Sequence, residues 1–314
     1  MATNKARWLP LALLCCQACA PHTPTPQLGP PSDPFAATVV RVRYVMGSML
    51  KIAVDAPESQ WIELLIDEAF SRAQALDKLL SNYDQQSALS RFNREGSVQS
   101  AMVPPGLYAC LRLSKEYSRQ TDGAFDITVG ALVLLHRRTA TPKPEQLKAA
   151  IAGIGDKHLR LLAANRATMD HPQTQLDMGA IGKGFAVDAI IDLLKERRIT
   201  SAFVDFGGSS FFGLGKPRGL AGWPVALGSG QTVALVDRAL SSSNSQHTGK
   251  NDALEFHIID PRSGQLVNAK RFVAVTAHTA TQSEVWSTAL VVDPSLAELA
   301  KRVGVRIEAL RTDN

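Results

Sequence analysis

The residues with the clearest chemical potential lie in one segment, Thr174–Asp188, which reads TQLDMGAIGKGFAVD. Lys183 supplies a point charge for a phosphate, and the Asp177 carboxylate can accept a hydrogen bond or hold a cation. Glycines at a strand-to-helix junction let backbone N–H groups approach an anion, which the helix dipole also favours. The other residues of interest here are Gly179, Gly182, Gly184 and Asp188. Together they indicate a nucleotide or pyrophosphate ligand.

The glycine spacing does not name that ligand by itself. It reads G-x-x-G-K-G, whereas the dinucleotide fingerprint is G-x-G-x-x-G and the P-loop is G-x-x-x-x-G-K-[ST]. Many strand-to-helix turns need glycine only for packing. The segment therefore leaves two interpretations open, an anion-binding turn and a packing turn.

Other segments carry groups that suit a nucleotide. Ser81-Asn82-Tyr83 offers a hydroxyl, an amide and a ring that can stack. In Thr121–Val129, Phe125 beside Asp126 either brackets a planar ring or is a buried aromatic next to a capping carboxylate. His257, in HIIDPRSG, either carries a proton near neutral pH or fixes the following turn.

Glu284 and Thr288 stand four residues apart in a segment with helical character. That spacing places both side chains on one face of a helix. Their oxygens can share a hard cation such as magnesium. A surface helix or a helix cap accounts for the pair equally well.

The elements that must position these groups are mixed. Alternating residues predict a hairpin from Val39–Val45 and Met49–Val54, and Thr174–Met178 is expected to be a further strand. Trp61–Leu80 and Gly182–Arg198 have the apolar spacing of helices, and Ser81–Asn93 is polar and loop-like. Strands come in groups rather than in strict alternation with helices. This favours an α+β fold with mixed or antiparallel sheets and packed helices.

The N-terminus has the pattern of an export signal. Lys5 and Arg7 precede an apolar run, and Ala18-Cys19-Ala20 resembles a cleavage site. We expect a signal peptide over residues 1–20, a Pro-rich linker over 21–38 and one domain over 39–314. Two destinations follow: a soluble periplasmic protein, or an inner-membrane lipoprotein in which Cys19 carries the lipid.

Composition narrows the classes of partner. The 314 residues carry a formal charge of +5, but lysine and arginine are scattered, so no basic stripe indicates nucleic-acid binding. Only Cys110 remains beyond the signal, so no disulfide can form within the mature chain. Cys110 lies in an apolar stretch and is expected to be a small buried hydrophobe.

The order of the motifs is more informative than any one of them. The motifs follow one another in the order MGS, SNYDQQSALSRFN, DGAFDITVGAL, LDMGAIGKGFAVD, VDFGGS, HIIDPRSG and EVWST, in a region from roughly Val39 to Val292. This series resembles the bacterial ApbE family of FAD:protein FMN transferases. The resemblance implies an α+β fold, export, FAD as substrate and Mg²⁺ as cofactor. It also implies the reaction, in which the FAD pyrophosphate is cleaved, AMP is released and FMN is esterified to a threonine of an electron-transfer protein.

The resemblance also assigns residues. The positions matching the FAD contacts of the family are Met46, Tyr83, Ala124, Phe125, Asp126, Asp177, Lys183 and Ile259. His257 matches the histidine implicated in activity, and the metal positions fall on Ala180, through its carbonyl, Glu284 and Thr288. This chain departs from the family at Glu284, where Asp is usual, and at Ser287, where a second carboxylate is frequent.

Three functions are compatible with these motifs. The first is a Mg²⁺-dependent FMN transferase that acts on exported proteins. The second is an FAD pyrophosphatase, in which water replaces threonine and the products are FMN and AMP. The third is an FAD-binding protein without catalysis, suggested by the altered Glu284 and Ser287 positions.

Overall fold

The computed structural model describes residues 38–97, 99–139, 141–227, 230–248 and 254–313. The predicted signal peptide, and all of the predicted linker except residue 38, lie outside these ranges. Among the helices in these ranges, none combines the length and the apolar character that a membrane crossing requires.

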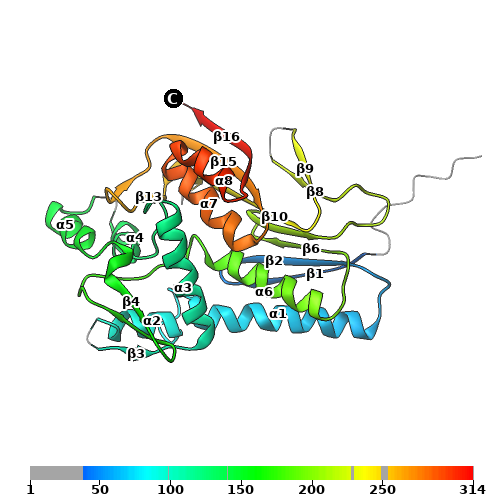
Figure 1. Cartoon of the computed structure of the whole chain (residues 1–314), viewed down its shortest axis with the longest axis horizontal. Helices are drawn as coiled ribbons and strands as arrows, with labels where there is room; N and C mark the ends of the chain where they lie inside the picture. Colours follow the sequence, from blue (N-terminus) through cyan, green and yellow to red (C-terminus); the bar gives the residue numbers. More distant parts are fainter. Residues whose placement is uncertain (1–37, 98, 140, 228–229, 249–253, 314) are drawn as a thin grey trace, which may run out of the picture. The chain divides into compact units, whose positions relative to one another are not determined.

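A seven-stranded sheet forms the frame of the domain (Figure 1). Every neighbouring pair in it is antiparallel. Its strands, in spatial order, are β1 (Thr38–Val45), β2 (Ser48–Asp55), β6 (Ala202–Phe206), β7 (Ser210–Leu214), β10 (Arg238–Asn244), β15 (Lys270–Ala277) and β16 (Arg306–Asp313).

The β1–β2 hairpin confirms the first predicted element. Val45 pairs with Ser48, which leaves Met46 and Gly47 as a two-residue turn. Both turn residues have positive φ, 49° at Met46 and 74° at Gly47, as the tight hairpin turns that match strand twist require. The turn fixes the register, and Leu50, Ile52 and Val54 all point to the buried face.

Two long helices cover that buried face. Helix α1 (Gln60–Leu80) begins at Ser59, whose hydroxyl accepts from the Ile62 N–H at 3.3 Å. Helix α6 (Gly182–Glu196) lies beside α1, and their apolar faces share one core cluster with β1, β2 and β6. The opposite face of the sheet is covered in part by the hairpin β8 (Trp223–Ala226) and β9 (Thr232–Leu235).

The remaining elements build a second core that also contains part of the central sheet. Its helices include α2 (Ala88–Glu95), α3 (Pro105–Gln120), α7 (Ala280–Val292) and α8 (Ala297–Arg302), with α4 (Gly130–Arg138) and α5 (Pro144–Ala152) forming a smaller cluster. Its small sheet consists of β3 (Ala101–Met102), β5 (Arg166–Met169) and β4 (Leu159–Leu162). Two further pairs are β11 (Gln246–Thr248) with β12 (Leu254–Phe256), and β13 (Ile259–Asp260) with β14 (Gln265–Leu266), whose Ile259 and Leu266 belong to the cluster of α4 and α5.

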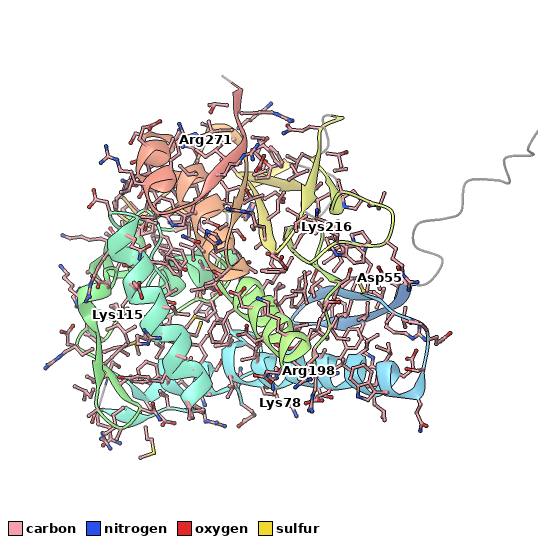
Figure 2. All side chains as sticks on the ribbon, turned by 45° about the vertical axis from the view of Figure 1, so that its right-hand side comes forward. Asp55, Lys78, Lys115, Arg198, Lys216 and Arg271 are labelled. Atoms are coloured by element: carbon pink, nitrogen blue, oxygen red, sulfur yellow. The ribbon has the colours of Figure 1, made fainter. Side chains whose placement is uncertain are left out.

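Long cationic side chains tie these elements together. Arg271 of β15 donates from Nη1 to the carbonyls of Val291 at 2.6 Å and Val292 at 2.9 Å, which caps the end of α7 (Figure 2). Lys115 of α3 donates to the carbonyl of Leu159 at 2.6 Å and so anchors the start of β4 (Figure 2). Both cations thus bind backbone carbonyls at the end of an element, the last turn of α7 and the first residue of β4.

The predicted α+β class with antiparallel sheets is confirmed, with two local corrections. Thr174–Met178 is not a strand, because no neighbour pairs with it beyond one isolated parallel bridge between Val129 and Gln175. The segment Ser81–Asn93 is not all loop, because α2 begins after Ser87, whose hydroxyl accepts from the Ser90 N–H at 2.9 Å. Cys110 is fully buried as expected, and burial raises the pKa of its thiol to about 12.

Candidate functional site

A pocket of about 560 Å³ collects most of the residues selected from the sequence. This volume lies within the range of small-molecule sites. Its lining comprises Tyr83, Ala124, Phe125, Asp126, Val129, Val133, Arg137, Asp177, Gly179, Ala180, Lys183, Ser209, Ser241, Ser242, Ser243, Asn244, Gln246, His257, Ile258, Ile259, Pro261, Phe272, Glu284 and Thr288. Every predicted site residue except Met46 is in this set.

The inner corner of the pocket is built around Glu284 on α7. We use this name for Lys183, Ser209, Ser241, Ser243, Glu284, Ser287 and Thr288. The Glu284 carboxylate is only 4% exposed, accepts from the Gly184 N–H at 2.5 Å and lies 3.8 Å from Lys183 Nζ. Burial raises the pKa of Glu284, while the Lys183 charge and the Gly184 N–H oppose that shift.

Hydroxyls complete the inner corner. Ser243 on β10 lies 2.7 Å from the Ser287 hydroxyl and 3.3 Å from the Thr288 hydroxyl, both on α7. Thr288 also donates to the Glu284 carbonyl at 3.2 Å. Ser287, where the family often has a carboxylate, is fully buried and contributes a neutral hydroxyl to this network. The inner corner thus contains one carboxylate, one lysine and several neutral oxygens.

Gly184 of the opening motif serves helix packing rather than anion binding. A Cβ on Gly184 would lie 2.4 Å from the Ala280 carbonyl oxygen, so this glycine lets α6 and α7 approach closely. The Gly184 N–H, in the first turn of α6, already binds Glu284. The Asp188 carboxylate accepts from the N–H groups of Ala280 at 2.6 Å and Thr281 at 2.9 Å, and therefore caps α7.

Asp177 is oriented from both sides. Its Oδ1 accepts from the Gly179 N–H at 2.7 Å, and its Oδ2 accepts from the Asn82 side chain at 2.5 Å. The second bond joins the loop that carries Tyr83 to the turn before α6. Because of these two bonds, the carboxylate has a fixed orientation at the edge of the pocket.

The segment Ala124–Asp126 adopts the commoner of the two predicted arrangements. Phe125 is 3% exposed and belongs to the hydrophobic core. The buried Asp126 carboxylate accepts from the Thr128 N–H at 2.8 Å and the Thr128 hydroxyl at 2.7 Å, which fixes its own turn. This segment lines the pocket, and the Asp126 carboxylate also accepts from the Ser118 hydroxyl of α3 at 3.2 Å, which joins the turn to that helix.

The sequence pointed to only one residue of the outer wall of the pocket, Tyr83. We use this name for Tyr83, Val129, Val133 and Arg137. The last three are spaced by four residues along α4 and its cap, so they share one helix face. Arg137 lies over the Tyr83 ring, with 4.8 Å between Cζ and the ring centre. The four-residue spacing is visible in the sequence, but it indicates a shared face only if residues 130–138 form a helix.

The remaining predicted residues occupy distinct positions. His257 is exposed and lies between β12 and β13, and the buried Ile259 follows it on β13. The half-buried Ala180 lies in the turn before α6. Met46 is outside the pocket lining; its N–H donates to Asp77 at 3.2 Å, and a Cβ at Gly182 would meet its methyl group at 3.5 Å. Met46 therefore supports the start of α6.

The oxygen donors of the inner corner, together with the Ala180 carbonyl, fit a magnesium ion rather than a soft metal. Glu284, the Thr288 hydroxyl and the Ala180 carbonyl offer oxygen atoms only, and all three residues line one pocket. Magnesium often uses one or two carboxylates and completes its shell with water and substrate phosphates. Within the described ranges, no cluster of three or more His, Cys, Asp or Glu side chains forms a metal site by itself.

The fold and this pocket define an α+β protein with a site suited to a phosphorylated, ring-bearing ligand. The chain belongs to the ApbE family, whose model matches residues 46–310. The ordered motifs in the sequence thus led to the correct family.

Two relatives of this chain have the same functional name. An FAD:protein FMN transferase of Klebsiella pneumoniae (strain 342) is 29% identical over 289 residues, covering 83% of this chain and 80% of the relative. An FAD:protein FMN transferase of Treponema pallidum (strain Nichols) is 31% identical over 253 residues, covering 71% of this chain and 70% of the relative.

Solved structures agree on the fold. The apo form of the flavinyl transferase ApbE of Pseudomonas stutzeri is 26% identical, has a TM-score of 0.75, and matches over 88% of this chain and 94% of that one. The flavin transferase ApbE of Vibrio cholerae is 24% identical, with a TM-score of 0.74 and coverage of 88% and 97%.

Proposed function

We propose that this protein is an FAD:protein FMN transferase. The observation that carries the proposal is the convergence of Lys183, Glu284 and Thr288 with Asp177 and His257 on one pocket, in a chain of the ApbE family. The names of the relatives support the same activity. Phosphoryl transfer depends mainly on positioning and charge neutralisation, and a lysine beside buried oxygen ligands supplies both.

The proposed step exchanges the phosphoanhydride bond of FAD for a phosphate ester bond to threonine. The oxygen of an acceptor threonine forms a bond to the flavin-side phosphorus of FAD, and the bond between that phosphorus and the bridging oxygen breaks. AMP leaves with the bridging oxygen, and FMN remains esterified to threonine. The threonine hydroxyl gives up its proton, and we assign His257 as the base because it is exposed at the pocket lining, where an acceptor can reach it.

We propose Mg²⁺ as the cofactor, held by Glu284, Thr288 and the Ala180 carbonyl. When bound, the ion neutralises charge on phosphate oxygens as the pyrophosphate bond breaks. Lys183 adds a second positive charge; its Nζ also donates to Ser209 at 2.7 Å, which fixes its position. The protein itself contributes the inner corner, whose charged and hydroxyl groups are already in position before the substrate binds.

We also propose a location and a class of acceptor, on the basis of the sequence. The predicted export signal over residues 1–20 supports a periplasmic location for the mature enzyme, either soluble or held at the inner membrane through Cys19. The acceptor is then an exported or membrane-associated subunit of an electron-transfer system. Fractionation of cells, with lipid labelling of the wild type and of Cys19→Ala, separates the two forms.

Incubation with FAD, Mg²⁺ and several candidate acceptor domains tests the proposal. We expect a fluorescent flavin that stays on the acceptor after denaturation and maps to one threonine. An acceptor in which that threonine is replaced by alanine serves as the control. AMP release without any labelled acceptor would indicate an FAD pyrophosphatase instead, and FAD binding without AMP release would indicate a non-catalytic flavin-binding protein.

A further inference from the structure

One charged group of the pocket has no role in the proposed reaction. Arg137, near the end of α4, lies over the face of Tyr83, and both residues line the pocket. Across the described part of the chain, no carboxylate lies within 4.0 Å of the Arg137 guanidinium, whereas Lys183 is 3.8 Å from Glu284. Arg137 is thus a cation of the lining without a carboxylate partner there.

The contact with Tyr83 occupies the face of the guanidinium and leaves its edges available. All five N–H donors of arginine lie in the plane of the guanidinium, and they match a phosphate in a two-pronged contact. Stacking on an aromatic ring does not use these donors. Tyr83 is 78% exposed, so the pair lies at the open side of the pocket, where a ligand can reach it.

The rest of the outer wall supports the same assignment. Val129 and Val133 present an apolar surface along the helix face that ends at Arg137. An apolar surface followed by a planar cation suits a ligand in which a ring is joined to a phosphate. Arg138, the next residue, has the same charge but does not line the pocket.

We propose that Arg137 binds a phosphate of the substrate and makes the pocket selective for FAD over flavins that lack phosphate. The proposal rests on the proposed function, because FAD is the ligand that brings the phosphate. Tyr83 holds the guanidinium in place, and the in-plane N–H groups donate to phosphate oxygens. Lys183 and Arg137 would then bind the dinucleotide at two separate points of the pocket.

Equilibrium titration of the full chain with FAD and with riboflavin, followed by flavin fluorescence, tests this role. For Arg137→Ala we expect FAD affinity to fall by about tenfold or more, the usual effect of losing hydrogen bonds to a charged group. Riboflavin affinity should change by less than about twofold, as for a surface substitution. Arg138→Ala removes the same charge one residue away and should leave both affinities within about twofold.

Several results would overturn the assignment. Unchanged FAD binding by Arg137→Ala would exclude a phosphate contact, and an equal loss for FAD and riboflavin would mean that Arg137 only shapes the wall. An equal FAD loss in Arg138→Ala would mean that net charge alone matters. All of these can occur while the wild type still labels an acceptor, so they leave the proposed function standing. A wild type that binds neither flavin would contradict both.

Discussion

The inner corner and the outer wall of the pocket are built in opposite ways. In the inner corner Glu284 is 4% exposed, Ser287 is fully buried, and each charged or hydroxyl group already has a partner within the protein. On the outer wall Tyr83 is 78% exposed, and Arg137 contacts a ring face rather than an anion. The inner corner is therefore preorganised, whereas on the outer wall the in-plane N–H groups of Arg137 are available to a ligand.

This difference assigns a separate task to each region. A preorganised corner suits the chemical step, because its groups need not rearrange as charge develops on the phosphates. An open wall suits recognition, because its donors become satisfied only when a ligand arrives. Substitutions in the corner should therefore change folding or turnover, and substitutions in the wall should change affinity.

The largest effect is expected where the corner depends on the contact between α6 and α7. Gly184→Ala places a Cβ 2.4 Å from the Ala280 carbonyl oxygen, so the helices must move apart. We expect the free energy of unfolding, measured by denaturant titration, to fall by about 3 kcal/mol or more.

Gly182→Ala is the matched control for this substitution. It lies two residues earlier in the same helix, and its Cβ would meet Met46 at 3.5 Å, an ordinary contact. The free energy of unfolding should change by less than about 1 kcal/mol. Equal losses in the two variants would contradict the close approach of α6 and α7 at Gly184.

Removing the Glu284 charge should separate turnover from folding. Glu284→Gln keeps an oxygen for the Gly184 N–H but loses the anion that faces Lys183. We expect the rate of FMN transfer to fall by about 100-fold, with FAD affinity reduced much less. Thermal unfolding should change much less than turnover, because glutamine has nearly the same volume and keeps the hydrogen bond with the Gly184 N–H. A variant with full turnover at low Mg²⁺ would refute the metal assignment.

Loss of the Asp188 acceptor at the start of α7 should have the next largest effect. Asp188→Ala leaves the N–H groups of Ala280 and Thr281 without their acceptor. The expected loss is about 2 kcal/mol in the free energy of unfolding. Asp192→Ala, an exposed carboxylate one turn further along the same helix, should cost less than about 0.5 kcal/mol. If both cost the same, general charge rather than capping is responsible.

The smallest expected effect is on the free energy of unfolding at acidic pH, and it comes from Asp293, the residue that follows α7. Hydrogen bonding from Ser295, assisted by Arg262, lowers the pKa of Asp293 below its ordinary value. A lowered pKa stabilises the folded state at higher pH, and that stability is lost as pH falls through the folded-state value. Between about pH 5 and pH 3, the wild type should lose about 1 kcal/mol more than Asp293→Asn in unfolding titrations. If the free energies of unfolding of the wild type and of Asp293→Asn fall in parallel with pH, the stabilising role of the Asp293 carboxylate is contradicted.

Local signals in the sequence predicted the elements that depend only on neighbours. The β1–β2 hairpin follows from alternation and a two-residue turn, and α1 from the Ser59 cap and its apolar spacing. Thr174–Met178 has a strand-like pattern, but a strand requires a partner, and no strand of the described ranges runs alongside it. Pairing partners come from distant parts of the chain, which local patterns do not show.

Site residues that lie in motifs could be predicted from the sequence. The residue that joins the site through the face of a helix, Arg137, could not. Asp177, Lys183, Glu284 and His257 stand in recognisable motifs, and the pocket brings them together. Arg137 carries no motif, because its role depends on the face that α4 turns toward Tyr83. That face is set by packing in three dimensions, since α4 is apolar on most sides and its orientation cannot be read from spacing.

The stoichiometry of one reaction tests the central claim most directly. The enzyme, FAD and Mg²⁺ are mixed with an acceptor that takes the label, and AMP release and acceptor mass are followed together. We expect one AMP for each FMN covalently bound to the acceptor threonine, with no AMP when that threonine is absent. AMP released at the same rate without the threonine would contradict transfer and identify water as the acceptor.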